Sequence, residues 1–342
     1  MVHDDRATEL TGTDEEVLAD LLKQVACCGT WSYRPAGPSA TEPASLAAIA
    51  LLAHGQLQAA QKPLRFLRSM QRPDGTVPAS SEAEAAPWTT AWAVLAWAMA
   101  AELEPATGSD WLSPLNAAVQ ALMRLRGLAA PTDERLIQHD TRLTGWSWVP
   151  GTHSWVEPTA LTVLALTAAG MAGTARVQEG LQLLLDRQLS CGGWNYGNTV
   201  VLGHELRPHV QPSGMATAAL VAAGNRSEAV RRACHYLETQ LTTCTGAASF
   251  SWCWLGLAAH RQDPADTCRR EWRKLVTSRS NTPRGPYHWA LLLWAAAGRE
   301  NHVWQVIRQR LSANAPSPPS RTAVPSPVTT KKASGPTSPP VR

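Results

Sequence analysis

Phenylalanine and tyrosine are scarce in this sequence, charged residues are few, and long apolar runs are absent. Its 342 residues include 2 Phe and 4 Tyr, and only 17% of them are charged. No stretch approaches the roughly 18 consecutive apolar residues that a transmembrane helix requires. The first residues are acidic and do not have the pattern of a secretory signal. These absences argue against a membrane-spanning or secreted protein and favour a cytoplasmic location.

Neither the cysteines nor the charges indicate a specialised class of protein. The seven cysteines are scattered and odd in number, so we expect reduced cysteines rather than a disulfide framework. The excess of basic residues lies in the last thirty positions, and the rest of the chain holds 27 residues of each sign. Nucleic-acid-binding proteins need a basic face. We therefore expect no nucleic-acid partner.

The last thirty residues also differ from the rest in composition. Residues 313–342 contain eight prolines among serine, threonine and alanine. Such a segment cannot bury enough apolar surface to offset the entropy lost on ordering, so we expect a disordered tail. Residues 1–13 are expected to form an N-terminal extension, which leaves residues 14–312 as one repeat domain.

An internal repeat organises this domain. In four segments rich in alanine and leucine, a proline and a glycine stand twelve residues apart. Proline in the first turn and glycine just past the last turn predict a short helix. Two further copies, at 87–97 and 251–260, are less regular. The four pairs are Pro43 and Gly55, Pro158 and Gly170, Pro212 and Gly224, and Pro286 and Gly298.

The six predicted helices are apolar on nearly every side, which is typical of helices that are buried all round. They alternate with segments whose apolar residues form a single stripe. Because helical repeats must stack to bury their apolar faces, this alternation predicts an all-α fold. We expect an (α/α)6 toroid, with the apolar helices as an inner ring and the amphipathic helices as an outer ring. The amphipathic segments lie near 14–26, 58–70, 113–126, 175–189, 227–241, 264–278 and 300–312.

A second repeat marks the ends of the predicted outer helices, where a glutamine precedes a glycine and, in some copies, a tryptophan. Gln71 precedes Gly75 in one copy, and Gln188 precedes Gly193 and Trp194 in another. Glycine supplies the positive φ that the turn needs.

The segment 184–194 resembles the Gln-Trp repeat of the prenyltransferase and squalene-oxidase-repeat superfamily, which includes squalene–hopene cyclases and protein prenyltransferase β subunits. The resemblance covers roughly residues 14–312. It implies a terpene cyclase-like α-toroid in which the Gln and Trp residues hold neighbouring helices together.

The catalytic signatures that this resemblance would bring are missing. The sequence contains neither the Asp-x-Asp-Asp acid of the cyclases nor the Asp-x-Cys zinc pair of the prenyltransferases. The pair Cys234-His235 falls within an expected outer helix, so we expect no metal site there. The cofactor, if the protein uses one, stays unknown at this point.

Polar and aromatic residues gather in the loops that lead into the predicted inner helices. In a toroid these loops open at one end, so their side chains could converge on the central cavity. Candidate catalytic residues are the acids and bases Asp140, Glu157, His204 and Glu205. Candidate ligand-binding residues are His139, Trp148, His153, Trp155, Trp194, Asn195, Tyr196, Arg207, His209, Gln211, His288 and Trp289.

Two functions remain open. The first is a cyclase-like toroid that binds an apolar isoprenoid or lipid-like ligand, with Asp140 or Glu157 as the acid and Trp148, Trp155 and Trp289 as the wall. The second is a non-catalytic binding or scaffold module for a protein partner or a polar ligand. An aromatic cavity that leads to a buried acid would favour the first function. A cavity plugged by Trp and Leu would favour the second.

Overall fold

The computed structural model describes residues 13–83, 86–103, 108–131, 137–278 and 285–313. The expected N-terminal extension and tail lie almost entirely outside these residues. The described part is built from helices, apart from the short hairpin β1 (Val200–Val201) and β2 (His204–Glu205). None of the described helices combines the length and the apolarity that a membrane span requires.

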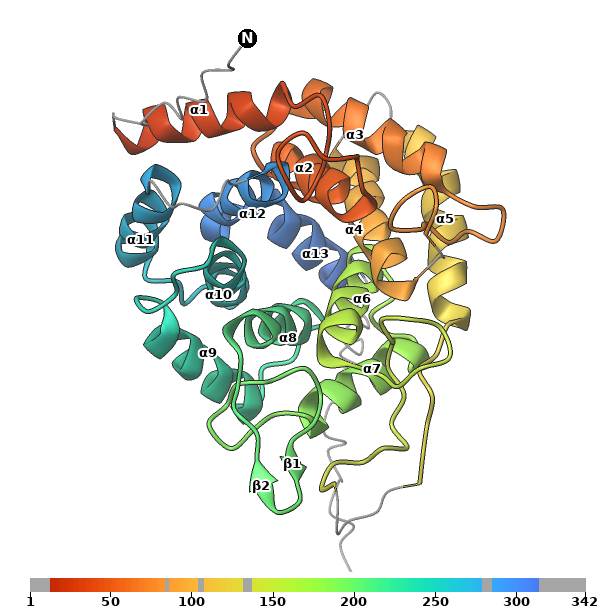
Figure 1. Ribbon diagram of the computed structural model, residues 1–342. Coiled ribbons are helices and arrows are strands. Elements are labelled where there is room, and N and C mark those ends of the chain that lie inside the picture. Colours follow the sequence, from red (N-terminus) through yellow and green to blue (C-terminus); the bar gives the residue numbers. More distant parts are fainter. Residues whose placement is uncertain (1–12, 84–85, 104–107, 132–136, 279–284, 314–342) are drawn as a thin grey trace, which may run out of the picture.

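Six of the described helices form an inner ring, which Figure 1 shows face on. Each packs against the next one in chain order, and α12 packs against α2, which closes the ring. Along the chain, these inner helices alternate with the helices of an outer ring. The predicted (α/α)6 toroid is therefore confirmed. The inner helices are α2 (Thr41–Ala53), α4 (Pro87–Leu103), α6 (Val156–Ala168), α8 (Val210–Ala222), α10 (Ala247–Ala259) and α12 (Pro286–Ala296). The outer helices are α1 (Asp14–Ala26), α3 (Leu57–Met70), α5 (Gly108–Arg124), α7 (Ala175–Asp186), α9 (Glu228–Gln240) and α11 (Ala265–Thr277).

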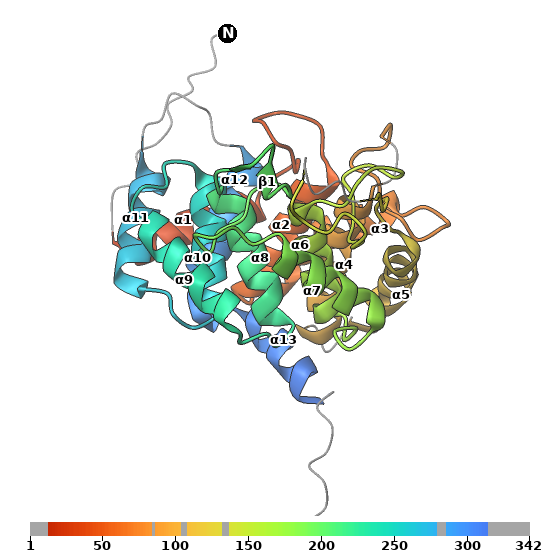
Figure 2. The same cartoon turned by 90° about the horizontal axis from the view of Figure 1, so that it is seen from below.

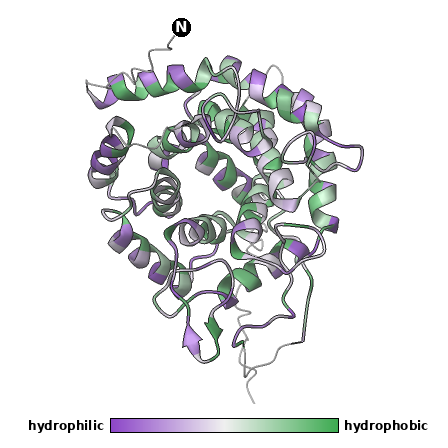
Figure 3. Ribbon diagram, viewed as in Figure 1, coloured by the Kyte–Doolittle hydropathy of each residue, from purple (hydrophilic) through white to green (hydrophobic). Residues whose placement is uncertain are grey.

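The two rings differ in hydropathy as the sequence predicts. The inner helices are buried along nearly their whole length, and the outer helices bury one stripe each. Figure 3 shows hydrophilic and hydrophobic residues alternating along the outer helices. This division is expected when each inner helix packs against its neighbours in the inner ring and against helices of the outer ring, while each outer helix keeps one face in solvent.

Glutamine and tryptophan side chains hold the outer helices in place. The Gln188 amide donates to the backbone oxygens of Gly192 and Ala229, 2.8 Å away in each case, and so joins the end of α7 to the start of α9. The Trp194 indole donates to the oxygen of Leu184 at 2.7 Å. Gln71 joins α3 to α5 in the same way. Through these contacts the Gln and Trp residues hold neighbouring helices together, which is the role that the resemblance implies for them.

The last helix departs from the sequence prediction. The segment near 300–312 is amphipathic and is predicted to belong to the outer ring. Instead, α13 (His302–Ala313), which follows the short 3-10 helix η1 (Gly298–Glu300), packs on α2, α4, α6 and α8. Its contacts fall at the carboxyl-terminal ends of these helices, where His302 meets the oxygen of Leu52 and Arg310 pairs with Glu102. The helix therefore closes one end of the toroid (Figure 2).

Candidate functional site

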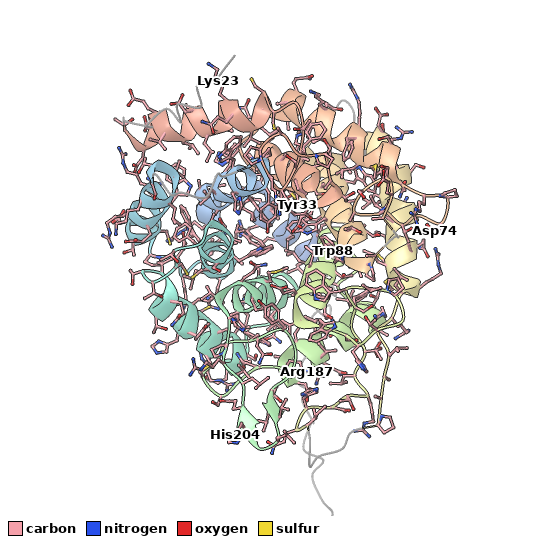
Figure 4. The ribbon with its side chains drawn as sticks, viewed as in Figure 1. Lys23, Tyr33, Asp74, Trp88, Arg187 and His204 are labelled. Atoms are coloured by element: carbon pink, nitrogen blue, oxygen red, sulfur yellow. The ribbon has the colours of Figure 1, made fainter. Side chains whose placement is uncertain are left out.

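A cavity of about 160 Å³ lies inside the inner ring, toward the amino-terminal ends of its helices and away from α13. All six inner helices contribute to its wall. Figure 4 shows Trp88 near the centre of the ring, with Tyr33 close by. The lining residues are Glu42, Trp88, Trp92, Trp148, Glu157, Pro158, Leu161, Gln211, Met215, Trp252 and Tyr287.

Two carboxyl groups line this cavity because the repeat places them there. Glu42 and Glu157 each precede the proline of a repeat, and each is the second residue of its inner helix, α2 or α6. Equivalent positions in a closed ring lie at the same height and point toward the same centre. The helix N-termini carry partial positive charge, which favours a carboxylate at this position.

Burial disfavours the ionised form of both carboxyl groups and so raises their pKa values. Burial raises the pKa of Glu42 to about 7, although hydrogen bonds from Tyr33 and Trp92 act in the opposite direction. Burial, together with the charge of Glu42, raises the pKa of Glu157 to about 7, and a hydrogen bond from Gln211 opposes this rise. Both carboxyl groups therefore titrate near neutral pH.

Their surroundings nevertheless differ. The Tyr33 hydroxyl donates to Glu42 Oε2 at 2.6 Å, and the Tyr33 ring is 41% exposed, so the site reaches solvent on the Glu42 side. Glu157 is 5% exposed and accepts a hydrogen bond from Gln211. The pair thus consists of a half-buried carboxyl group, Glu42, and a buried one, Glu157.

Aromatic rings surround the carboxyl groups. Trp88 and Trp148 meet edge to face, with ring centroids 5.4 Å apart. Trp92 and Trp252, 6.0 Å apart, both also contact Trp294, beneath the cavity. The cavity is therefore aromatic, and its wall includes the carboxyl groups of Glu42 and Glu157.

A second cavity, of about 280 Å³, lies between the segment before α6 and the turn after α7. It is lined by His139, His153 and Trp155, together with Arg187. Burial, and next the charge of Arg187, lowers the pKa of His139 to about 4, so this imidazole is neutral at neutral pH. Figure 4 shows Arg187 far from Tyr33 and Trp88, so these residues form a separate site.

Asp140 lies beside the second cavity and not at the central one. Its carboxylate accepts hydrogen bonds from the Arg142 side chain and backbone, and these bonds lower its pKa. His204 and Glu205 are exposed on the β1–β2 hairpin, where Glu205 accepts from the backbone and hydroxyl of Ser190. These hydrogen bonds lower the pKa of Glu205. The three residues do not converge with Glu157.

The remaining predicted residues have varied surroundings. Trp194 is fully buried against α7, and Asn195 hydrogen-bonds within its own loop. Tyr196 stacks on His209 at 4.9 Å on the surface. The structure places the others as follows: Gln211 and Trp148 at the central cavity, Arg207 exposed, and His288 and Trp289 half-buried on α12 beside Tyr287.

Sequence reasoning missed several residues of the central cavity. Glu42 was not among the candidate residues, although it precedes a repeat proline as Glu157 does, and that shared position was the available signal. Trp88 and Trp92 were visible only as members of an apolar helix, and Tyr33 and Tyr287 were not among the candidate residues. Within the described residues, no group of three or more His, Cys, Asp or Glu side chains is arranged to hold a metal ion.

No protein-family model matches the sequence, and no curated protein matches it. Several solved structures are similar. A variant of the type II terpene cyclase MstE from Scytonema, in complex with its substrate geranylgeranyl dihydroxybenzoate, matches 86% of this chain and 98% of its own, with 13% identity and a TM-score of 0.53. A novel alpha-amylase from Clostridium perfringens matches 84% of this chain and 97% of its own, with 9% identity and a TM-score of 0.58.

A protein from Actinoplanes matches 87% of this chain and 100% of its own, with 14% identity and a TM-score of 0.54. Because these neighbours include a cyclase and an amylase, the similarity alone does not select an activity. The chain has an α-toroid fold like that of a type II terpene cyclase.

Proposed function

We propose that this protein binds an isoprenoid-like ligand in its central cavity and acts on it by acid–base chemistry at Glu157 and Glu42. The observation that carries the proposal is an aromatic cavity lined by two carboxyl groups, the buried Glu157 and the half-buried Glu42. Tryptophan walls suit an apolar chain and stabilise positive charge that develops on it. The similar terpene cyclase, whose structure contains a geranylgeranyl substrate, supports the choice of ligand class.

The surroundings of the two carboxyl groups assign their roles. Glu42 accepts hydrogen bonds from Tyr33 and Trp92, which favour its ionised form. Glu157 is more deeply buried and is repelled by the charge of Glu42, which favours its protonated form. Both pKa values lie near 7, so the assignment of roles rests on these contacts and not on a difference in pKa. Glu157 is therefore the proton donor and Glu42 the acceptor.

In the proposed step, Glu157 transfers its proton to one carbon of a ligand double bond. A C–H bond forms, the π bond breaks, and the adjacent carbon becomes a cation that faces the rings of Trp88 and Trp148. Glu42 then removes a proton from a neighbouring carbon, and a new double bond forms. The ligand is isomerised, or cyclised if a second double bond attacks the cation, and the pair again holds one proton.

The size of the cavity limits what it can enclose. Its 160 Å³ is close to the volume of about 150 Å³ that holds one benzene molecule in an engineered protein cavity. One end of an isoprenoid fits this space, and the rest of a longer chain must extend past Tyr33 toward solvent. The proposal thus predicts chemistry at a terminal isoprene unit.

The test is incubation of the full chain with geraniol and with geranylgeraniol in D2O, followed by mass spectrometry of bound and released ligand. Proton transfer from Glu157 predicts one deuterium on carbon in the product. E157Q should abolish this incorporation and still bind the ligand. The control E205Q changes an exposed glutamate outside the cavity and should leave both unchanged.

Each other outcome is informative. Binding without deuterium incorporation would refute the acid role of Glu157 and leave a binding protein. If neither alcohol binds, the isoprenoid assignment fails and the scaffold function is favoured. Incorporation that persists in E157Q would place the acid elsewhere.

A further inference from the structure

The charge of the central cavity is unbalanced. Glu42 and Glu157 both line it, and no Lys, Arg or His is among the lining residues that the structure describes. The other titratable groups that face the pair are the phenols of Tyr33, from the loop before α2, and Tyr287, from α12. Neither phenol can supply a positive charge. At neutral pH the cavity therefore carries negative charge without a fixed counterion.

The same cavity presents aromatic faces and edges on several sides. Trp88 and Trp148 form one aromatic pair, Trp92 and Trp252 a second, and Tyr287 completes the lining from α12. Aromatic faces combined with carboxylates are the chemistry that recognises organic ammonium groups, because the ring quadrupole and the carboxylate both attract a cation that has little need of water. A neutral apolar chain would use the rings and leave the carboxylates uncompensated.

We infer that the central cavity selects a ligand that carries a permanent cationic group, an alkylammonium of about the size of a trimethylammonium head. This inference goes beyond the proposed function and shares with it only the choice of cavity, because a cationic head group that fills the cavity takes the place of the terminal isoprene unit. The cation lies among the rings next to Glu42 and Glu157, and the chain leaves the cavity past Tyr33. The cavity, at 160 Å³, matches a compact head group.

The test compares two probes of nearly the same shape, choline and 3,3-dimethylbutan-1-ol, which differ in the charge of one atom. Isothermal titration calorimetry with the full chain at pH 8 should show choline binding at least about 10-fold tighter than the neutral alcohol, in line with a desolvated cation–π contact plus carboxylates. E42Q should remove most of this preference and leave binding of the neutral alcohol unchanged.

Choline should also displace protons. Because both carboxyl groups titrate near pH 7, a bound cation lowers their pKa values and releases protons at pH 7. Titrations in two buffers with different ionisation enthalpies measure this release. It should disappear in the double variant E42Q/E157Q. W88L should weaken choline binding, and W88F, which keeps a ring, should restore much of it.

Equal affinities for the two probes, or choline binding that E42Q leaves unchanged, would overturn the inference. Failure of the inference is separable from failure of the proposed function. If geraniol binds and choline shows no preference, the isoprenoid proposal stands alone. If choline binds and geraniol does not, the cavity is an ammonium site and the isoprenoid proposal fails.

Discussion

Replacing Glu157 by glutamine should stabilise the protein at alkaline pH. Glu157 is 5% exposed, and burial raises its pKa from 4.5 to about 7. A carboxyl group whose pKa is higher in the folded than in the unfolded state stabilises the folded state fully below the unfolded pKa. This stabilisation is lost as the pH rises through the folded pKa, which is about 7 here. A rise of this size corresponds to about 3 kcal/mol in the free energy of unfolding between pH 4.5 and pH 8.5.

Glutamine keeps the shape of the side chain and cannot ionise. We therefore expect E157Q and the wild type to have similar unfolding free energies at pH 4.5, and E157Q to be more stable by about 3 kcal/mol at pH 8.5. Urea unfolding at the two pH values measures the difference directly.

The matched control is E205Q. Glu205 is exposed, and hydrogen bonds from Ser190 lower its pKa, so its linkage has the opposite sign. Its contribution is present at high pH and is lost as the pH falls, so E205Q should not be more stable than the wild type at pH 8.5. An E157Q protein that is equally or less stable than the wild type at pH 8.5 would refute the burial of an uncompensated carboxylate.

Two further predictions concern the fold. In α8, a Cβ on Gly214 would lie 2.2 Å from the backbone oxygen of Trp252, so G214A should force α8 and α10 apart and cost about 2 kcal/mol, as overpacking typically does. Gly246 has no atom within 4 Å of such a Cβ, so the thermal midpoint of G246A should be close to that of the wild type, and equal midpoints for the two variants would contradict the close approach. W194F removes the indole donor to the Leu184 oxygen and leaves a buried carbonyl without its partner, so it should lower the free energy of unfolding in urea by about 1–3 kcal/mol. An unchanged unfolding free energy would show that this hydrogen bond does not support the outer ring.

The sequence predicted the rings because their signals are local and repeated. Helices that are apolar on every side have to be buried. The proline–glycine spacing that recurs along the chain predicts their length. The misassignment of α13 has a physical reason. An amphipathic stripe shows that one face of a helix is covered, and it does not show which surface covers it. The stripe of α13 packs on the ends of the inner helices rather than on their sides.

The site was predicted less well, because the convergence of loops depends on contacts that no local pattern reports. Glu157 and Gln211 reach the central cavity because they begin inner helices. Asp140 lies in the long segment before α6, where its carboxylate pairs with Arg142 and not with a group at the central cavity. Glu42 was not among the candidates, although a closed ring brings side chains at repeated positions, such as Glu42 and Glu157, together at its centre.

The most direct test of the account is a carboxyl titration of the full chain labelled with 13C at the glutamate side-chain carboxyl carbon, followed by NMR from pH 3 to pH 9. The account predicts two resonances with midpoints near 7, one of which is lost in E42Q and the other in E157Q. If every glutamate titrates near its ordinary value, the central cavity does not hold a buried acid–base pair, and the proposed chemistry is contradicted.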